Sequence, residues 1–393
     1  MSQCGVDIDP SILERARAFE VAPAEEPQRV VVALSGGVDS AVAAWLLKEA
    51  GHEVMGVTLR LAPDDTSSLE VRSGRCCSAD DMTDARQLCE KLDIPFYAID
   101  ARDTFAEKVF DPFVDAYRKG ITPIPCLACN HVVKFGDLLK TARQLNAHLA
   151  TGHYARVVSY GGQKTLARPV DVSRDQTYYL YGTEPSAMES LVLPLGDLDK
   201  PFVRGLAARM GLRVAHKPDS QEICFVPDGD HAKVVEQASG SLPGGDLVHI
   251  DGKVLRQHDG IHRFTIGQRR GIKVGTGEKL YVVDVNPDTH DVVVGRKADL
   301  MCTQIETSTP RVIVPTDAWP EVVLVQVRAR HKGAPAKWSI SKEGNLRFHF
   351  LDSVDAVAPG QAAVAYDQDC LLGGGIIAAR CDGRFPRKLV VHG

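Results

Sequence analysis

The segment Ser35-Gly36-Gly37-Val38-Asp39-Ser40 places two hydroxyls, a pair of glycines and a carboxylate in one short turn. A glycine-paired turn before a helix leaves backbone N–H groups unpaired, and such groups bind phosphate. The hydroxyls of Ser35 and Ser40 can donate to phosphate oxygens, and Asp39 can orient the loop or help to hold Mg²⁺. The segment has no lysine at the helix start, unlike the G-x-x-x-x-G-K-[ST] loop that grips β- and γ-phosphates. The alternative is a tight turn in an ordinary βαβ unit.

Two cysteines far apart in the sequence stand in contexts that suit thiol chemistry. Cys129 follows the proline-rich segment 122–126 at the start of a predicted helix, where the helix dipole lowers the pKa of a thiol. Cys224 ends a polar run and lies between Ile223 and Phe225, which predicts a thiol within a hydrophobic patch. Two buried structural cysteines are the alternative interpretation.

A metal cluster is a further interpretation of these cysteines. Cys126 forms a C-x-x-C pair with Cys129, and a zinc or iron–sulfur site would need more ligands. Cys224 and the adjacent pair Cys76-Cys77 are candidates, although adjacent cysteines are poorly spaced for chelation. We expect no bound metal other than Mg²⁺, and we treat Cys126 as part of a loop.

The segments that must position these residues alternate between strand and helix. We expect strands over residues 29–34, 54–59, 96–100 and 148–151, and helices over 10–19, 41–50, 80–92, 104–117 and 132–145. Such alternation predicts a doubly wound, mostly parallel sheet, whose ligands bind beyond the carboxyl ends of the strands. The loop 35–40 and the turn Gly152-His153 both follow strands at that edge.

The pattern changes after about residue 230, where short alternating runs and turn residues predict β-rich domains, the last a small β-barrel. We therefore expect four parts: an N-terminal extension, a nucleotide-binding catalytic domain, a small central domain and a C-terminal β-barrel domain, over residues 1–27, 28–229, 230–285 and 286–393.

Composition limits the class of protein. Hydrophobic residues make up 44% and charged residues 25% of the chain, which is ordinary for a globular protein. No stretch approaches the about 18 consecutive apolar residues of a membrane span. The first 27 residues are acidic and lack an apolar stretch, so we expect a cytoplasmic protein without a signal peptide.

Charge is unevenly distributed along the chain. Residues 1–120 hold 13 Lys and Arg against 22 Asp and Glu, and the remaining residues hold 33 against 29. We therefore expect a polyanion larger than a nucleotide to bind mainly to the segments after residue 120.

Six motifs in one order give a specific resemblance. They are residues 35–40, the Cys-Asn-x-x-x-Lys-Phe run from Cys129, Thr151-Gly152-His153-Tyr154, Arg174-Asp175-Gln176, Asp219–Phe225 and Gly373-Gly374-Gly375-Ile376-Ile377. Together they resemble the tRNA-specific 2-thiouridylase (MnmA/TrmU) family of the PP-loop ATP pyrophosphatase superfamily. The resemblance covers about residues 28–385.

The resemblance implies a reaction. ATP adenylates O2 of the wobble uridine in a tRNA anticodon, and a protein persulfide then transfers sulfur to C2, giving 2-thiouridine, AMP and pyrophosphate. It implies that Cys129 is the nucleophile and that Cys224 carries the persulfide, and the two can form a disulfide when sulfur is delivered. The expected cofactors are ATP and Mg²⁺, and the expected partners are tRNA and a sulfur donor, either a cysteine desulfurase or a sulfur carrier protein. We expect a monomer.

The resemblance also implies binding positions. The positions that match the family's ATP site are Ala33, Leu34, Ser35, Gly36, Gly37, Val38, Asp39, Ser40, Leu59 and Gly152. Matching the loop that meets the target base are Ile124, Pro125 and Cys126. Matching its tRNA contacts are His153, Arg174, Asp175, Gln176, Arg330, His331 and Gln361, with His331 where the family usually has tyrosine.

Two other classes of protein share such a loop. One is a synthetase or amidotransferase of the same superfamily that acts on a small metabolite, and the paired cysteine contexts argue against it. The other is a non-catalytic protein that binds tRNA or a nucleotide. The presence of Ser35, Asp39, Ser40, Cys129 and Cys224 argues against that class.

Overall fold

The computed structural model describes residues 6–61, 79–217, 219, 223–226, 229–275 and 277–381. The pair Cys76-Cys77 lies outside the described residues. The chain forms two compact units: Met1–Ala106 with Ala128–Gly229, and Glu107–Leu127 with Asp230–Gly393. Within the described ranges, no helix is both long enough and apolar enough to cross a membrane.

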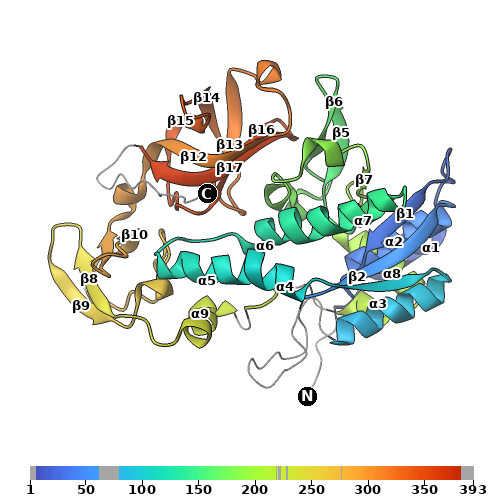
Figure 1. The fold of residues 1–393 in the computed structure, drawn as a ribbon, viewed down its shortest axis with the longest axis horizontal. Helices are drawn as coiled ribbons and strands as arrows, with labels where there is room; N and C mark the ends of the chain where they lie inside the picture. The colour runs from blue at the N-terminus through green and yellow to red at the C-terminus, as the bar shows by residue number, and fades with distance from the viewer. Residues whose placement is uncertain are drawn as a thin grey trace. The chain divides into compact units, whose positions relative to one another are not determined.

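The first unit is built on a five-stranded sheet in the order β3-β2-β1-β4-β7 (Figure 1). Every neighbouring pair is parallel, so the prediction of a parallel doubly wound sheet is confirmed. The strands are β1 (Arg29–Ala33), β2 (Glu53–Arg60), β3 (Phe96–Asp100), β4 (His148–Thr151) and β7 (Leu191–Val192).

The helices that surround this sheet follow the local sequence signals. Asp9 caps α1 by accepting from Ser11 N, and Pro10 occupies its first position. Strand β1 lies in the apolar core of the unit, because Val30, Val31 and Val32 are fully buried. The unit's helices are α1 (Pro10–Ala18), α2 (Val38–Glu49), α3 (Ala79–Leu92), α4 (Arg102–Phe105), α7 (Leu138–Gln144) and α8 (Lys200–Arg209).

Two features of this unit lie outside the predicted elements. One is the antiparallel hairpin β5 (Arg156–Tyr160) and β6 (Gln163–Ala167). The other is α8, which packs against α1 and α2 and lies beside them in Figure 1.

The helical segment that carries Cys129 begins earlier than predicted. Helix α6 spans Pro125–Ala128, and the π-helical segment η2 (Cys129–Asp137) follows it and leads into α7. Only the first turn of a helix has unpaired N–H groups. Cys129 therefore lies one turn past the helix start, and the dipole effect expected of it is correspondingly weaker. Similarly, the helix predicted over 104–117 is interrupted by the π-helical η1 (Ala106–Phe110).

The second unit contains two β-sheets, as the turn-rich sequence predicts. One has the order β10-β11-β8-β9, and the other is a six-stranded antiparallel sheet, β12-β15-β14-β13-β16-β17, closed into a barrel by pairing of β12 with β17. The strands of these two sheets are β8 (Gly245–His249), β9 (Val254–His258), β10 (Tyr281–Val285), β11 (Val292–Gly295), β12 (Cys302–Val312), β13 (Val322–Gln326), β14 (Ala334–Ile340), β15 (Leu346–Val354), β16 (Ala362–Asp367) and β17 (Cys370–Arg380).

Helices α5 (Asp111–Arg118) and α9 (His231–Ser239), with most of η1 and α6, also belong to the second unit, and short 3₁₀ turns join the elements of both units. Across both units these turns are η3 (Val172–Arg174), η4 (Thr177–Tyr179), η5 (Pro185–Ala187), η6 (Arg213–His216), η8 (Ile261–Arg263), η9 (Lys297–Leu300) and η10 (Thr316–Ala318). The glycine-rich motif 373–377 lies within β17, where a Cβ at Gly373 would approach the carbonyl oxygen of Arg311 to 2.6 Å. Close packing of β17 on β12 thus explains that motif.

Candidate active site

The segment 35–40 forms a loop between β1 and the first turn of α2. Gly36 has φ +67°, and a Cβ there would lie 2.5 Å from the Cα of Asp81 on α3. Gly37 is the N-cap of α2, and it has no side chain to bond the N–H groups of the first turn. Those N–H groups, at the positive end of the helix dipole, can bind an anion.

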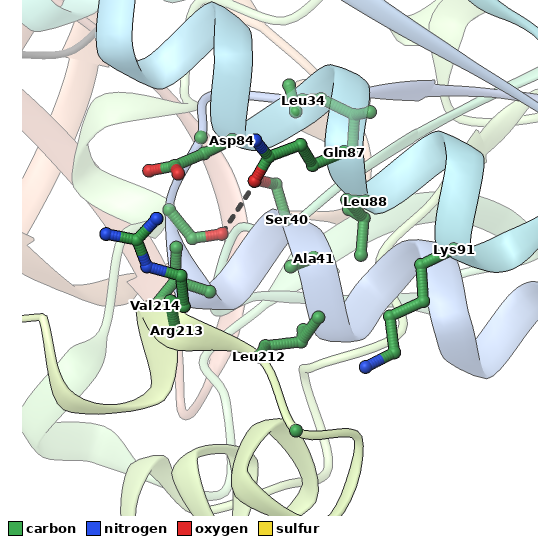
Figure 2. Close-up of a pocket in the computed structure, with 14 residues that line it drawn as sticks. Leu34, Ser40, Ala41, Asp84, Gln87, Leu88, Lys91, Leu212, Arg213 and Val214 are labelled. Carbon is green, nitrogen blue, oxygen red and sulfur yellow. Dashed lines mark hydrogen bonds between the residues drawn. The ribbon is translucent and has the colours of Figure 1, made fainter.

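The two serines of the loop bond to each other. Ser40 Oγ accepts from Ser35 N at 3.2 Å, lies 3.2 Å from Ser35 Oγ and donates to the Gly37 carbonyl oxygen at 3.2 Å. Figure 2 draws the last of these bonds. Because Ser40 is buried, its hydroxyl fixes the closed shape of the loop, while Ser35 is only half-buried.

A cavity of about 180 Å³ lies at the carboxyl ends of β1, β2 and β4. A Cβ at Gly152, after β4, would lie 2.6 Å from Ser40 N, so only glycine lets this turn approach the loop so closely. The fold therefore brings residues from five segments of the sequence to one cavity. It is lined by Ala33, Leu34, Ser35, Asp39, Ser40, Val57, Leu59, Leu61, Lys134, Leu138, Thr151, Gly152, His153 and Gln176.

His153 faces this cavity as a neutral side chain. Its Nδ1 lies 2.7 Å from Thr151 Oγ1, and its ring centroid is 5.9 Å from that of Phe135. The ring keeps some exposed surface, but its burial among protein atoms, and then the charge of Lys134, lower the pKa of His153 to about 3. His153 can therefore exchange hydrogen bonds with a ligand at neutral pH without adding a positive charge.

A second cavity, of about 160 Å³, lies on the other side of the loop (Figure 2). Asp84 and Gln87 of α3 line one wall, and residues 212–214 form the opposite wall. Gly36, Gly37 and Ser40 line it as well, so the loop separates two hollows.

Asp39 belongs to a chain of ion pairs. Lys200 Nζ donates to Asp39 Oδ1 at 2.8 Å and to Oδ2 at 2.7 Å, and it also lies 2.9 Å from Asp219 Oδ1. Asp219 in turn binds Arg204 at 2.5 Å and, through Oδ2, Arg174 at 2.9 Å. The Tyr154 hydroxyl donates to Asp39 Oδ1 at 3.0 Å.

The environment of these groups shifts two pKa values. Burial opposes ionisation of Asp219, but the hydrogen bond and charge of Lys200, with the charges of Arg204 and Arg174, hold its pKa below the usual value. Burial, and then the charge of Asp39, raise the pKa of Tyr154, which stays protonated and can donate. Asp39 supplies the carboxylate among the described residues that line the first cavity, and it could hold Mg²⁺ there.

The two cysteines singled out by sequence both lie in the first unit. Cys129 is buried, whereas Cys224 is half-buried. Next to Cys224 in the sequence, the Phe225 ring packs edge-on against Phe105 with centroids 5.6 Å apart, and Val226 is buried. Among the residues that the structure describes, no group of three or more His, Cys, Asp or Glu side chains is placed to hold a metal ion.

The motif Arg174-Asp175-Gln176 follows the hairpin β5–β6. Arg174 is partly exposed, whereas Asp175 is engaged within the protein: it pairs with Arg168 and accepts from Thr177 N at 2.9 Å. Gln176 Oε1 accepts from Tyr154 N at 2.7 Å, and the side chain also lines the first cavity.

The remaining predicted positions lie in the second unit. Gln361 Nε2 donates to the Thr122 carbonyl oxygen at 3.1 Å, so it holds the segment that leads into Ile124, Pro125 and Cys126. Arg330 is exposed, and His331 Nδ1 accepts from Gly333 N at 3.2 Å. Burial, and then the charge of Arg328, lower the pKa of His331.

Sequence reasoning missed Lys200. The pattern Asp199-Lys200-Pro201 does carry a signal, because Asp199 caps α8 by accepting from Phe202 N at 2.7 Å and Pro201 lies in the first turn. A lysine at the positive end of a helix is unfavourable unless carboxylates neutralise it. Their identities, Asp39 and Asp219, depend on the tertiary fold.

Comparison with known proteins covers nearly the whole chain. Residues 28–228 match the family model described as the tRNA methyl transferase HUP domain, residues 232–296 the tRNA methyl transferase PRC-barrel domain, and residues 303–377 the Aminomethyltransferase beta-barrel domain. The tRNA-specific 2-thiouridylase MnmA of Rhodospirillum centenum is 46% identical over 369 residues, which cover 91% of this chain and 93% of the relative. The MnmA of Bartonella bacilliformis is 45% identical over 366 residues, covering 90% and 92%.

Similarity to a solved structure is much weaker. The NMN synthetase of Francisella tularensis is 19% identical and covers 60% of this chain and 89% of its own, with a TM-score of 0.34. We draw no conclusion about the fold or the activity of this chain from that structure.

Proposed function

Because the chain belongs to the tRNA-specific 2-thiouridylase family, we propose that it uses ATP to convert the wobble uridine of tRNA anticodons to 2-thiouridine. The cavity beside the loop 35–40 carries the proposal within the structure. Gly152 lets the turn after β4 approach the loop closely, so this cavity lies beside the unpaired N–H groups of α2.

The lining of this cavity suits an adenine nucleotide. Leu59 and Val57 offer apolar surface, while Ser35 and the first turn of α2 offer donors to phosphate oxygens. The loop has no lysine of the kind that grips β- and γ-phosphates, which favours cleavage between the α- and β-phosphates. When bound, Mg²⁺ would neutralise phosphate charge, and Asp39 is the residue that would hold it.

The first half-reaction activates an oxygen that is otherwise a poor leaving group. Uridine O2 attacks the α-phosphorus of ATP, an O–P bond forms, and pyrophosphate leaves. The proposed target-base loop is Ile124, Pro125 and Cys126. The proposed tRNA contacts are His153, Arg174, Asp175, Gln176, Arg330, His331 and Gln361.

The second half-reaction replaces that oxygen with sulfur. The terminal sulfur of a persulfide on Cys224 bonds to C2, and AMP leaves with O2. Cys129 attacks the inner sulfur, so the S–S bond of the persulfide breaks and a Cys129–Cys224 disulfide forms. An external thiol reductant must then restore both thiols.

The remaining parts of the proposal concern partners and setting. A cysteine desulfurase or a sulfur carrier protein would supply the persulfide sulfur in a cytoplasmic, reducing environment. We assign residues 28–229 to the catalytic domain, 230–285 to a central domain and 286–393 to the barrel domain of a monomer, with 1–27 as an extension.

Product analysis tests this function. Purified protein, ATP, Mg²⁺, wobble-uridine tRNA and a persulfide donor should give AMP, pyrophosphate and 2-thiouridine in equal amounts, measured by chromatography of nucleotides and of digested tRNA. Asp39→Ala should abolish AMP release, whereas Lys48→Met, an exposed change on the same helix, should not. Stoichiometric ADP, or AMP release without thiolated tRNA, would contradict the proposal.

A further inference from the structure

Lys200 is almost fully buried between two carboxylates that belong to different parts of the first unit. Its side chain is 6% exposed, and the Asp39 and Asp219 side chains are 32% and 17% exposed. An ammonium has three N–H donors, and in this structure two point to Asp39 and the third to Asp219. Lys200 therefore has no donor left for a ligand while it holds both carboxylates.

Asp219, the carboxylate outside the loop, connects Lys200 to the protein surface through Arg174. Asp219 binds Lys200 and Arg204 through Oδ1 and Arg174 through Oδ2. Of these three cations Arg174 is the most exposed, at 36% of its side chain, while Lys200 and Arg204 are at 6% and 7%. Arg174 also lines a surface hollow with Ser173. It is thus the partner that can leave Asp219 at least cost and reach a solvent-side anion.

We propose that Lys200 is a positioning residue that couples the phosphate-binding loop to Arg174, so that a Mg²⁺-nucleotide on the loop strengthens tRNA binding. This inference rests on the proposed function, which assigns ATP to the loop and tRNA to Arg174. With a divalent cation held by Asp39, the Lys200 ammonium would leave that carboxylate. It would turn wholly to Asp219 and neutralise it, and Arg174 would become available to a tRNA phosphate.

The coupling has a thermodynamic signature. If a nucleotide on the loop raises tRNA affinity, tRNA must raise nucleotide affinity by the same factor. We expect a factor of about five to ten, the lower part of the usual range for coupled sites. The wild-type test measures tRNA dissociation constants with and without α,β-methylene-ATP, which cannot be cleaved between those phosphates. Parallel arms contain Mg²⁺ or EDTA, and only the Mg²⁺ arm should show the gain.

Variants separate coupling from a merely structural role. Asp219→Asn leaves the Lys200–Asp39 pair intact and removes the charge that holds Arg174. It should bind tRNA without nucleotide about as tightly as the nucleotide-bound wild type does, and the analogue should add nothing. Lys200→Met should lose the coupling, and Lys200→Arg, which keeps the charge, should restore part of it. The control Lys48→Met should keep the wild-type factor.

The outcomes are distinguishable. Equal tRNA affinity with and without the analogue in the wild type would overturn the inference, and so would an undiminished factor in Asp219→Asn. If Lys200→Met no longer binds the analogue, Asp219→Asn alone decides. A wild type that thiolates tRNA but shows no coupling loses only this inference, whereas one that makes no 2-thiouridine loses the proposed function.

Discussion

At the residue scale, Cys129 and Cys224 differ in how far the protein shields them from water. Cys129 is 7% exposed on the helical segment η2, and Cys224 is half-buried beside Phe225. An acceptor next to Cys129 is also buried: Asn130 donates through Nδ2 to the Tyr179 carbonyl oxygen at 3.2 Å, while its Oδ1 has no hydrogen-bond partner in the structure. A donor from substrate or from a reacting thiol could satisfy this Oδ1. The greater exposure of Cys224 suits a thiol that must meet a donor protein.

This difference leads to a prediction about sulfur. Either Cys129→Ser or Cys224→Ser should reduce 2-thiouridine formation below about 1% of wild type, because each removes a bonding sulfur, and ATP and tRNA binding should stay near normal. Radiolabelled sulfur from the donor should remain on Cys224 in Cys129→Ser and be absent from Cys224→Ser, as measured by peptide mapping. Cys302→Ser, a buried change in the barrel, is the control and should retain activity.

Two results would contradict that assignment. Label found chiefly on Cys129 would exchange the roles of the two cysteines. Activity that depends on Cys126 as strongly as on Cys129 and Cys224 would favour a cluster held by all three thiols.

Residues that act through their neighbours in sequence were predictable, and those that act through the fold were not. The hydroxyls of Ser35 and Ser40 bond within one turn, so the sequence alone identifies them. The Lys200–Asp39 pair joins residues 161 positions apart, and no local pattern specifies it. The same is true of Gln361, whose bond to the Thr122 carbonyl oxygen spans 239 positions.

At the element scale, α1 braces α8, the helix that begins at Lys200. A Cβ on Gly205 of α8 would lie 2.8 Å from Ile12 Cγ2 and 3.2 Å from Ala16 Cβ, so the two helices touch closely. Arg209 Nη1 donates to the Ala16 carbonyl oxygen at 3.0 Å, and the Arg15 guanidinium lies 4.0 Å from the Phe202 ring centroid. The family model begins only at residue 28, so α1 is an addition to it.

A matched pair of substitutions tests this contact. Ala16→Leu places extra carbons where Ala16 is fully buried against α8, and overpacking should lower the free energy of unfolding by about 1–3 kcal/mol. Ala18→Leu makes the same change at an exposed position of α1 and should alter it by less than about 0.5 kcal/mol. Urea denaturation followed by circular dichroism measures both, and equal effects would show that α1 does not brace α8.

The boundaries of the elements show which parts of the fold follow from the local sequence pattern. Strands β2 and β3 and helix α3 follow their hydrophobic patterns, and the predicted bounds differ from those observed by a residue at most. The local sequence pattern did not predict helix α8 or the long strands β12 and β17. A Cβ on Gly373 or Gly375 of β17 would clash with β12, so a contact between distant strands, and not the local pattern, explains these glycines. The start of the Cys129 helix at Pro125 was missed because proline at the first helical position resembles proline in a loop.

At the scale of the whole molecule, both units carry residues of the proposed reaction. The first holds the loop 35–40 and the two cysteines, and the second holds Arg330, Gln361 and residues 124–126. In the second unit, Gln361, just before the barrel strand β16, supports the segment before residue 124. A substitution at Gln361 should therefore affect that loop as well as any direct contact with tRNA.

The sulfur balance of the proposed reaction calls for an external donor. Each turnover would transfer one sulfur atom to tRNA and leave a disulfide, so the protein's own cysteines could not sustain a second turnover. Purified protein with ATP, tRNA, a dithiol reductant and free cysteine should therefore give no 2-thiouridine, because a cysteine thiol carries no sulfane sulfur to transfer. Adding a pyridoxal-phosphate-dependent cysteine desulfurase should restore multiple turnovers, and ³⁵S from labelled cysteine should appear in the tRNA. Omitting the dithiol should slow turnover, because free cysteine, a weaker monothiol reductant, is then the thiol left to reopen the disulfide. Sustained thiolation from free cysteine alone would contradict the requirement for a donor, and an unchanged turnover rate without the dithiol would contradict disulfide formation.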